Sequence, residues 1–238
     1  MATQLDRIST VLFDVGDTLH HLDHAFIAGA VTRYSHPVAA HDVAVAEYTA
    51  KAEVDARFRA RHSGRDEDRR FSYFETILDA LNVPTPAVEP IMSEVYAEDT
   101  RQSLWRVMHA DTPRVLAELR RRGFRLAVVS NADGRVSAGL QASGLAEHLT
   151  AIVDSHVVGV EKPDARIFRI ALEGCNAFPA EAIYVGDIYE IDVRGARNAG
   201  MTAVLLDPLE CYGDVDCLRI TGLGQLLTLL PAEAPHCL

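Results

Sequence analysis

Short apolar runs that each end at polar residues constrain the fold of this chain more than any other feature. These runs span residues 10–13, 125–129, 182–185 and 201–206. The residues that follow them include Asp14, Ser130, Asp187 and Asp207. Because the runs are apolar throughout instead of alternating, they are typical of strands that are buried on both faces of a sheet.

Helical patterns separate the later runs. They cover residues 112–122, 134–143, 163–173 and 191–199, and a glycine follows each of them. Glycine is suited to the left-handed conformation that closes many helices. Strands that alternate with helices predict an α/β fold with a parallel sheet, in which ligands bind at the carboxyl ends of the strands. We therefore expect Asp14, Ser130 and Asp187 to gather at that edge.

The stretch from residue 20 to residue 104 interrupts this alternation. It predicts helices at residues 23–35, 39–62, 69–81 and 87–102, with no strand between them. A segment of this size can form a small helical domain of its own. We therefore expect a core of residues 1–19 and 105–238 and an inserted helical domain of residues 20–104.

The composition is that of an acidic, folded protein. Of the 238 residues, 48% are hydrophobic and 24% are charged, and 23 Lys and Arg against 34 Asp and Glu give a formal net charge of −11. A chain with this charge repels phosphate backbones and anionic lipid, which argues against nucleic-acid and membrane partners. The first residues lack the charged and then apolar pattern of a secretion signal, so we expect a cytoplasmic protein.

Four separated segments carry the candidate catalytic and ligand-binding residues. They are Asp14-x-x-Asp17-Thr18, Ser130-Asn131, Lys162-Pro163-Asp164 and Gly186-Asp187-x-x-x-x-Asp192. Together they resemble the signature motifs of the haloacid dehalogenase-like (HAD) hydrolase superfamily, and the form of the first motif is similar to that of the Reg-2-like branch. The resemblance covers essentially the whole chain. It implies a HAD-like (Rossmann-like) catalytic core and a helical, C1-type cap that selects the substrate.

Aspartates at adjacent strand ends predict a metal site. At a separation of about 4 Å, Asp14 and Asp187 would repel each other by several kcal/mol. A hard divalent cation removes this repulsion, and Mg²⁺ prefers such an all-oxygen ligand set. The resemblance implies that Asp14 is both nucleophile and ligand, and that the Gly16 carbonyl and Asp187 are further ligands. It implies that Asp192 supports the metal indirectly or through a water.

Phosphate-binding groups are expected beside this metal. Lys162 is one of only two lysines in the chain, and its compact ammonium can reach both a nucleophilic carboxylate and a phosphoryl group. The alternative is a solvated surface lysine at the start of a helix. The Ser130 hydroxyl and the main-chain amide of Asn131 can donate to a phosphate oxygen. Ser130 could also be the N-cap of the helix expected to begin near residue 133.

The first motif departs from the pattern of the phosphatases in this superfamily. Those members carry a second aspartate two residues after the nucleophile, where it protonates the leaving group, but this chain has Gly16 there. A carboxylate comes one residue later, as Asp17, at a position that is usually glycine. Asp17 is a candidate general acid or a structural residue of the turn. His20, His21 and His24 are alternative acids because histidine titrates near neutrality.

These observations predict a Mg²⁺-dependent phosphoester hydrolase that acts through an aspartyl phosphate on a small phosphorylated metabolite. The missing acid predicts slow turnover, since general acid–base catalysis contributes roughly 10²- to 10⁴-fold. The alternative is a catalytically weak relative that binds a phosphorylated ligand or a protein partner. A 2-haloacid dehalogenase is less favoured, because that chemistry is metal-free and does not need the Asp187 and Asp192 pair.

Overall fold

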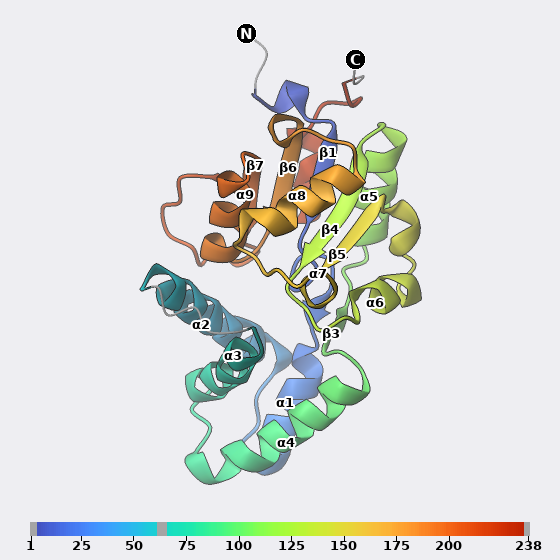
Figure 1. Cartoon of the computed structure of the whole chain (residues 1–238). Coiled ribbons are helices and arrows are strands. Elements are labelled where there is room, and N and C mark those ends of the chain that lie inside the picture. The colour runs from blue at the N-terminus through green and yellow to red at the C-terminus, as the bar shows by residue number, and fades with distance from the viewer. Residues whose placement is uncertain (1–3, 61–65, 236–238) are drawn as a thin grey trace. The chain divides into compact units, whose positions relative to one another are not determined.

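The computed structural model describes residues 4–60 and 66–235 (Figure 1). Contacts divide the chain into two units. The first unit consists of Met1–His20 and Met108–Leu238, and the second consists of His21–Val107. The segment predicted to be inserted, residues 20–104, spans most of the second unit, and its role as a cap stays a prediction.

A parallel sheet forms the centre of the first unit. Within the described residues it has six strands, in the order β5-β4-β1-β6-β7-β8. They are β1 (Thr10–Phe13), β4 (Arg125–Ser130), β5 (Ala151–Asp154), β6 (Ala182–Gly186), β7 (Thr202–Leu206) and β8 (Leu218–Ile220). Strand β1 pairs in parallel with β4 on one side and with β6 on the other. The α/β fold with a parallel sheet that the sequence predicts is confirmed.

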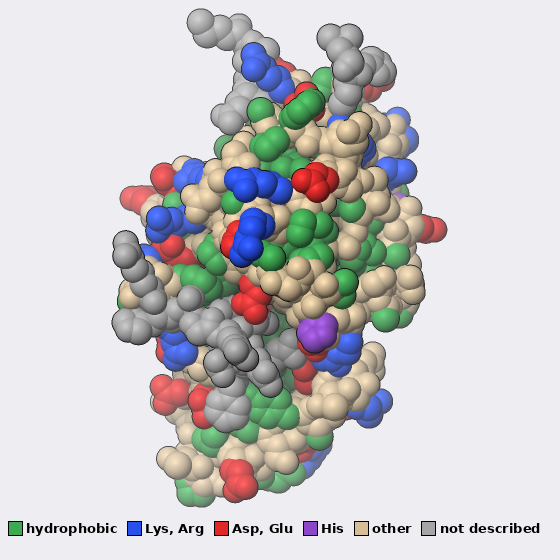
Figure 2. Space-filling view, in the orientation of Figure 1, with side chains coloured by type: hydrophobic (Ala, Val, Ile, Leu, Met, Phe, Trp, Pro, Cys, Tyr) green, Lys and Arg blue, Asp and Glu red, His purple; other side chains and the backbone are tan. Residues whose placement is uncertain are grey.

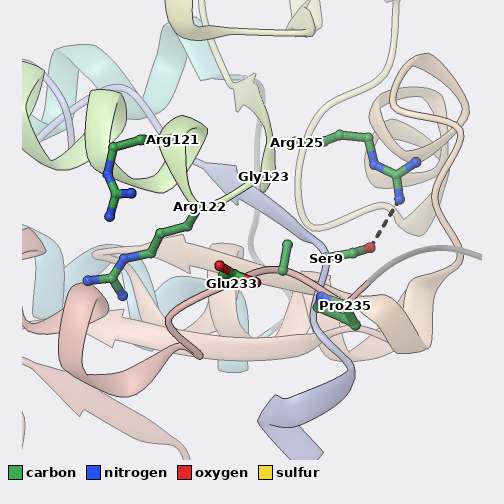
Figure 3. Close-up of a pocket in the computed structure, with 8 residues that line it drawn as sticks. Ser9, Arg121, Arg122, Gly123, Arg125, Glu233 and Pro235 are labelled. Atoms are coloured by element: carbon green, nitrogen blue, oxygen red, sulfur yellow. Dashed lines mark hydrogen bonds between the residues drawn. The ribbon is translucent and has the colours of Figure 1, made fainter.

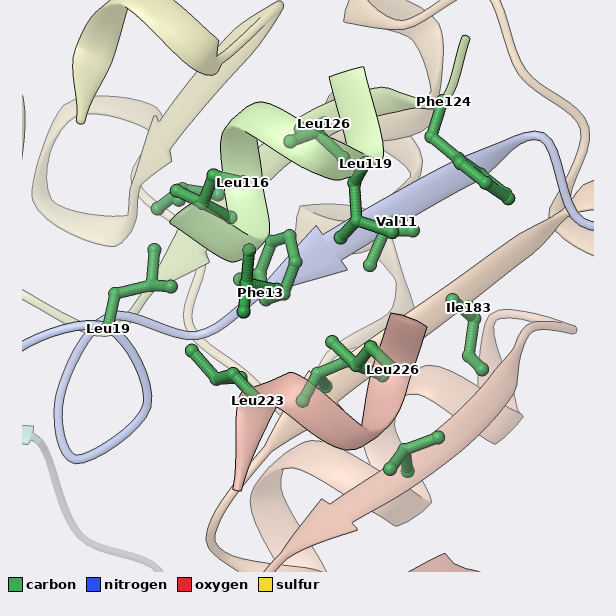
Figure 4. Packing of buried hydrophobic residues seen from close by; sticks show 14 of the residues in the cluster. Val11, Phe13, Leu19, Leu116, Leu119, Phe124, Leu126, Ile183, Leu223 and Leu226 are labelled. Carbon is green, nitrogen blue, oxygen red and sulfur yellow. The ribbon is translucent and has the colours of Figure 1, made fainter. Parts of the chain in front are cut away.

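Side chains that alternate along the strands fill a hydrophobic core on each face of this sheet. The helices that pack on the two faces of the sheet are α5 (Thr112–Arg121), α6 (Val136–Ala142), α8 (Ala165–Gly174), α9 (Arg194–Asn198) and α10 (Leu226–Leu229). Val11 and Phe13 pack in one cluster with α5, α6 and α10 (Figure 4). Leu12 packs in another cluster with α8 and α9, which lie in front of the sheet in Figure 1. Burial on both faces explains why β1 is apolar throughout.

The predicted strands of the first unit lie close to the observed ones. Strand β1 spans the residues predicted for it, and β4, β6 and β7 each differ from the predicted range by a single residue at one end. The sequence does not predict β5 and β8, which form the two edges of the sheet. Strand β5 begins with two partly buried residues and ends in Asp154, and two of the three residues of β8 are exposed. Neither strand therefore carries the long apolar signal of a buried strand.

Helices make up most of the second unit. They are α1 (His24–Tyr34), α2 (Ala40–Arg59), α3 (Asp66–Ala80) and α4 (Thr85–Arg101). An antiparallel ribbon of β2 (His21–Leu22) and β3 (Trp105–Val107) joins the two ends of the unit. As predicted, no strand lies between these helices among the described residues. Strand β2, which precedes α1, is not predicted, because a strand this short leaves no periodic signal.

The surface of the described residues carries charged and hydrophobic side chains side by side (Figure 2). On the face shown in Figure 2, acidic and basic side chains are interspersed, which is typical of a solvated surface. None of the described helices is long and apolar enough to cross a membrane.

Candidate active site

Two neighbouring strands bring the predicted nucleophile and a predicted metal ligand to one edge of the sheet. Strands β1 and β6 pair in register up to Phe13 and Val185, and the Asp14 amide donates to the Val185 carbonyl at 2.8 Å. Asp14 directly follows β1, and Asp187 directly follows β6. Because the two parallel strands end together, both carboxylates lie at the carboxyl edge, where ligands bind in such folds.

Three buried carboxylates at this edge form a cluster that fits a divalent metal ion. Asp14, Asp187 and Asp192 each offer one oxygen, and these oxygens lie within 4.8 Å of one another. All three residues are buried. The Lys162 ammonium contacts two of them, so the ionised cluster has an excess of two negative charges. A hard dication that takes oxygen ligands, such as Mg²⁺, supplies the missing charge.

Lys162 lies between two of these carboxylates. Its Nζ atom donates to Asp14 Oδ1 at 2.6 Å and to Asp192 Oδ1 at 2.7 Å. The residue is only 3% exposed, so the alternative of a solvated surface lysine is wrong. Burial lowers the pKa of Lys162, but the charges of Asp14 and Asp192 outweigh burial and raise the pKa well above its ordinary value. The ammonium therefore stays charged at neutral pH.

The same surroundings change the acidity of Asp14. Burial raises the pKa of its carboxyl to about 6, even though the charge of Lys162 lowers it, and the charge of Asp192 adds to the rise. A bound dication would favour the charged form of the carboxyl further. Asp14 is therefore ionised at neutral pH, as both a nucleophile and a metal ligand must be.

The Asn131 side chain holds the main chain of Lys162. Its Oδ1 atom accepts from the Lys162 amide at 2.7 Å, and its Nδ2 atom donates to the Lys162 carbonyl at 3.0 Å. The peptide bond between Lys162 and Pro163 is cis. Because Asn131 directly follows β4, this pair of hydrogen bonds ties the loop that carries the lysine to the sheet. The main-chain amide of Asn131 is a separate group, and its predicted contact with phosphate stays a prediction.

The end of β4 places Ser130 at the same edge of the sheet. Ser130 is buried and lies opposite Asp154 in the register of β4 and β5. The Asp154 carboxylate accepts from the amides of Gly134 at 3.0 Å and Val136 at 3.4 Å, so it organises the loop after Ser130. Helix α6 begins only at Val136, and its N-cap is Arg135. The interpretation of Ser130 as the N-cap is therefore wrong.

The turn after β6 holds Asp192 in place. Its Oδ2 atom accepts from the amides of Asp187 at 3.1 Å and Ile188 at 3.0 Å. A Cβ atom on Gly186 would come within 2.6 Å of both Cβ and Oδ2 of Asp192, which explains why this position is glycine. Asp192 lies in the π-helical turn η4 (Tyr189–Val193), which continues into α9. Turns of this kind are frequent at functional sites.

The chain turns sharply after Asp14. The Val15 carbonyl accepts from the amides of Leu19 and His20, both at 2.9 Å. The Asp17 amide donates to the His20 carbonyl at 2.7 Å. Asp17 is buried and has a φ of 53°, in the left-handed region that favours glycine. The residue that replaces the usual glycine is thus the one with the unfavourable backbone conformation, and its role as general acid stays a prediction.

The histidines near this turn have partners of their own. His20 forms an isolated β-bridge with Gly16, and its Nε2 atom lies 2.9 Å from the Ser143 hydroxyl. Burial lowers the pKa of His20 below its ordinary value, so its ring is neutral at pH 7. In the second unit, the Nε2 atom of His24 lies 2.9 Å from Glu47. These contacts favour structural roles for both rings over proton transfer.

Tyr184, which is not among the predicted site residues, belongs to the same cluster. It lies within β6, is fully buried, and its hydroxyl accepts from Lys162 Nζ at 3.0 Å. The hydroxyl donates to the Val129 carbonyl at 2.9 Å and lies 3.3 Å from Asp192 Oδ1. The available signal is a tyrosine in an otherwise aliphatic buried strand, since a buried hydroxyl needs a partner.

A separate pocket lies at the amino ends of the strands, on the side of the sheet away from the carboxylate cluster (Figure 3). Its volume is about 350 Å³, and Ser9, Arg121, Arg125 and Pro235 are among the residues that line it. Ser9 precedes β1 and Arg125 begins β4, so the pocket lies at the amino ends of the strands. Arg125 donates to the Ser9 hydroxyl at 3.0 Å, which is the dashed contact in the figure. The residues that line this pocket include none of the predicted site residues.

Comparison with known proteins shows similarity along most of the chain. The family profile described as haloacid dehalogenase-like hydrolase matches residues 8–200. The chain is 32% identical over 240 residues to haloacid dehalogenase-like hydrolase domain-containing protein 3 of Mus musculus, covering 95% of this chain and 94% of that protein. It is 37% identical over 161 residues to a phosphoserine phosphatase of Thermus thermophilus, covering 67% of this chain and 63% of that enzyme.

A solved structure shows the same fold. A putative HAD-hydrolase of Bacillus subtilis, bound to magnesium, superimposes with a TM-score of 0.68 at 20% identity. The superposition covers 94% of this chain and 99% of the other. At this level of identity the match concerns the fold alone.

Proposed function

Because this chain belongs to the haloacid dehalogenase-like hydrolase family, we propose that it is a Mg²⁺-dependent phosphatase that acts on a small phosphorylated metabolite. Its similarity to a phosphatase of the family supports this reaction. The observation that carries the proposal is the cluster of three buried carboxylates and the Lys162 ammonium. Its excess negative charge suits a dication, which in turn attracts a phosphoryl group.

In the proposed reaction, Asp14 attacks the phosphorus atom of the ester. A carboxylate oxygen of Asp14 bonds to phosphorus while the bond from phosphorus to the leaving oxygen breaks, which gives an aspartyl phosphate and an alkoxide. A proton from the enzyme or from water converts the alkoxide into the product alcohol. Water then attacks the aspartyl phosphate and loses a proton, which releases inorganic phosphate and the free Asp14 carboxylate.

The metal ligands that we propose belong to the two turns at the ends of β1 and β6. Asp14, Asp187 and the main-chain carbonyl of Gly16 would hold Mg²⁺, and Asp192 would support it indirectly or through a water. The ion, when bound, supplies positive charge to the phosphoryl oxygens. Asp192 has a further role, because its carboxylate accepts from Lys162 and keeps the ammonium beside Asp14.

The groups that we propose for phosphate binding come from the end of β4 and the loop that follows α7 (Ser155–Val158). The Ser130 hydroxyl and the Asn131 amide would donate to the phosphoryl oxygens, and Lys162 would neutralise part of their charge. The Asn131 side chain fixes the main chain of Lys162, which makes the position of that charge reproducible.

Proton supply to the leaving group is the weak part of this site. Gly16 has no side chain to donate a proton, and Asp17 is the residue that we propose in its place. Asp17 is one residue further along the turn and has the left-handed conformation, so its carboxyl has a different direction from that of the usual acid. We therefore expect slow hydrolysis of esters whose leaving group is a poor one, such as alkyl phosphates.

Gly16 also favours the second candidate function, a protein that binds a phosphorylated ligand without useful turnover. Such a protein would keep the carboxylate cluster and Lys162 but complete few reaction cycles. A metal-free dehalogenase is less favoured, because a cluster of three carboxylates with excess negative charge has no purpose in that reaction.

Hydrolysis of p-nitrophenyl phosphate, measured with and without Mg²⁺, tests the proposal. We expect release of p-nitrophenol that requires Mg²⁺ and that Asp14→Asn reduces by at least about 10³-fold, because an amide cannot form the aspartyl phosphate. Asp111→Asn is the matched control, since the Asp111 side chain is 70% exposed and lies at the start of α5. That variant should retain the full rate.

Two other outcomes would replace the proposal with one of its alternatives. Mg²⁺ binding without release from this ester or from a panel of metabolite phosphates would support the binding protein. Chloride release from 2-chloropropionate without added metal would support the dehalogenase.

A further inference from the structure

All three N–H groups of the Lys162 ammonium are already engaged. A protonated lysine has three donors and no acceptor. These donors go to Asp14 at 2.6 Å, to Asp192 at 2.7 Å and to the Tyr184 hydroxyl at 3.0 Å. Lys162 is 3% exposed, so water has little access to it. A phosphoryl oxygen can therefore accept from Lys162 only if one of the three partners gives up its hydrogen bond.

The hydrogen bond to Tyr184 is the easiest of the three to give up. Asp14 and Asp192 are charged partners, and a hydrogen bond between two charged groups is about twice as strong as a neutral one. Losing either of them would also leave a buried carboxylate without its counter-ion. Tyr184 is neutral and makes the longest of the three contacts.

The Tyr184 hydroxyl also remains satisfied after such a loss. It has a single proton, which it donates to the Val129 carbonyl at 2.9 Å. That hydrogen bond does not depend on Lys162. When the ammonium turns away, the hydroxyl loses an accepted hydrogen bond but leaves no donor unpaired, so the exchange costs little.

We propose that Tyr184 holds the third N–H of Lys162 in the free enzyme and releases it to a phosphoryl oxygen when the substrate binds. This inference rests on the proposed function, because it requires a phosphoryl group at Asp14. Tyr184 is a positioning residue in this scheme. It keeps the ammonium oriented and paired while the site holds no phosphate, and the incoming phosphoryl oxygen takes its place.

The substitution Tyr184→Phe tests the exchange. It removes the hydroxyl but keeps the ring, whose centroid lies 5.0 Å from that of Phe168. Free Tyr184→Phe protein would have one unpaired N–H on Lys162, which bound phosphate would satisfy. The Val129 carbonyl loses its donor in both states, so its effect on binding cancels. We expect the variant to bind inorganic phosphate, with Mg²⁺ present, about tenfold more tightly than the wild type in a calorimetric titration.

A second measurement does not depend on affinity. Lys51 and Lys162 are the only lysines in the chain, so protein labelled with ¹⁵N-lysine has two side-chain signals, and Lys51 serves as an internal reference. We expect the Lys162 signals of wild type and Tyr184→Phe to differ in the free proteins and to converge in the phosphate complexes. Signals that stay as far apart in the complexes as in the free proteins would overturn the exchange.

Tyr96→Phe is the matched control, because it removes a tyrosine hydroxyl from α4 in the second unit. It should leave the affinity for phosphate unchanged. Weaker or equal binding of phosphate by Tyr184→Phe would refute the exchange and leave the proposed function intact. A wild-type protein that binds no phosphate and hydrolyses no ester would refute the proposed function itself, and the exchange with it. If Tyr184→Phe does not fold, the wild-type Lys162 signal alone decides, because the exchange requires it to move on addition of phosphate.

Discussion

The turn after β6 keeps every group of the expected motif, whereas the turn after β1 has its second carboxylate one residue further along. After β6, Gly186 leaves space for Asp192, whose carboxylate accepts from two amides and from Lys162. After β1, Gly16 occupies the place of the acid, and Asp17 follows with a φ of 53°. Both strands pair in register, so the sheet supports the two turns equally. In the proposed site, metal binding depends on both turns, whereas proton donation depends on the turn after β1 alone, so the acid can change while the carboxylate cluster stays.

The largest effect is expected from Gly186→Ala, which disrupts the turn after β6. The added Cβ would come within 2.6 Å of three atoms of Asp192, so Asp192 must move and Lys162 loses its second carboxylate. We expect the rate of p-nitrophenyl phosphate hydrolysis to fall by about 10³-fold. Overpacking in a buried turn should also lower the free energy of unfolding by about 1–3 kcal/mol in a urea titration.

Gly139→Ala is the matched control for this variant. Gly139 lies in α6, and a Cβ at this position would have no heavy atom within 4 Å. Alanine is the better helix former, so we expect Gly139→Ala to raise the free energy of unfolding by about 0.5–1 kcal/mol and to retain the rate. Full activity of Gly186→Ala would show that the turn after β6 tolerates change as readily as the turn after β1.

The next largest effect is expected from Gly16→Asp, which repairs the altered turn. General acid catalysis contributes roughly 10²- to 10⁴-fold, and the gain is greatest when the leaving group is a poor one. We expect kcat to rise by about 10²-fold for an alkyl phosphate and to change little for p-nitrophenyl phosphate, whose leaving group needs no proton. An equal change for both esters would contradict the idea that only the acid is missing.

Sequence and structure agree best where a feature depends on a continuous stretch of chain. The buried strand β1 has a continuous apolar run and the long helices have helical periodicity, and their predicted bounds lie near the observed ones. Strands β2, β5 and β8 have no continuous run of buried apolar residues. Strand β2 has two residues, β5 begins with two partly buried residues and ends in Asp154, and two of the three residues of β8 are exposed, so local composition gives little sign of them.

The candidate site shows the same division. Asp14, Asp187 and Lys162 are recognisable from strand ends and motif spacing, and the structure brings these three residues together. Tyr184 and Gly186 act through the atoms that approach them in space. Gly186 belongs to the fourth motif and Tyr184 stands out in an aliphatic strand, but neither signal identifies the group that each one contacts. The hydroxyl of Tyr184 matters because Lys162 lies beside it, and Gly186 matters because Asp192 fills the space of its side chain.

A smaller effect is expected from pH on metal binding. Its pH dependence shows which of the two turns carries the carboxylate that titrates. Burial raises the pKa of Asp14 to about 6, so below this pH a proton competes with Mg²⁺ for the carboxylate. We expect the affinity for Mg²⁺, measured by calorimetry, to be constant above pH 7 and to fall by about tenfold per pH unit below pH 6. Asp14→Asn should bind Mg²⁺ more weakly but without this slope. The same slope in that variant would assign the titration to the turn after β6.

The smallest effect is expected from Asp17→Gly, which tests why the turn after β1 differs. Glycine adopts a φ of 53° without steric cost, but it also gains freedom in the unfolded chain, so we expect the free energy of unfolding to rise by only about 0.5 kcal/mol. Asn82→Gly, with a φ of 58° in the second unit, is the matched control and should change stability by a similar amount. If Asp17 is the proton donor, the more stable Asp17→Gly variant hydrolyses alkyl phosphates more slowly than the wild type. An unchanged rate would make Asp17 a residue of the turn alone, and the turn after β1 would then supply the nucleophile without any acid.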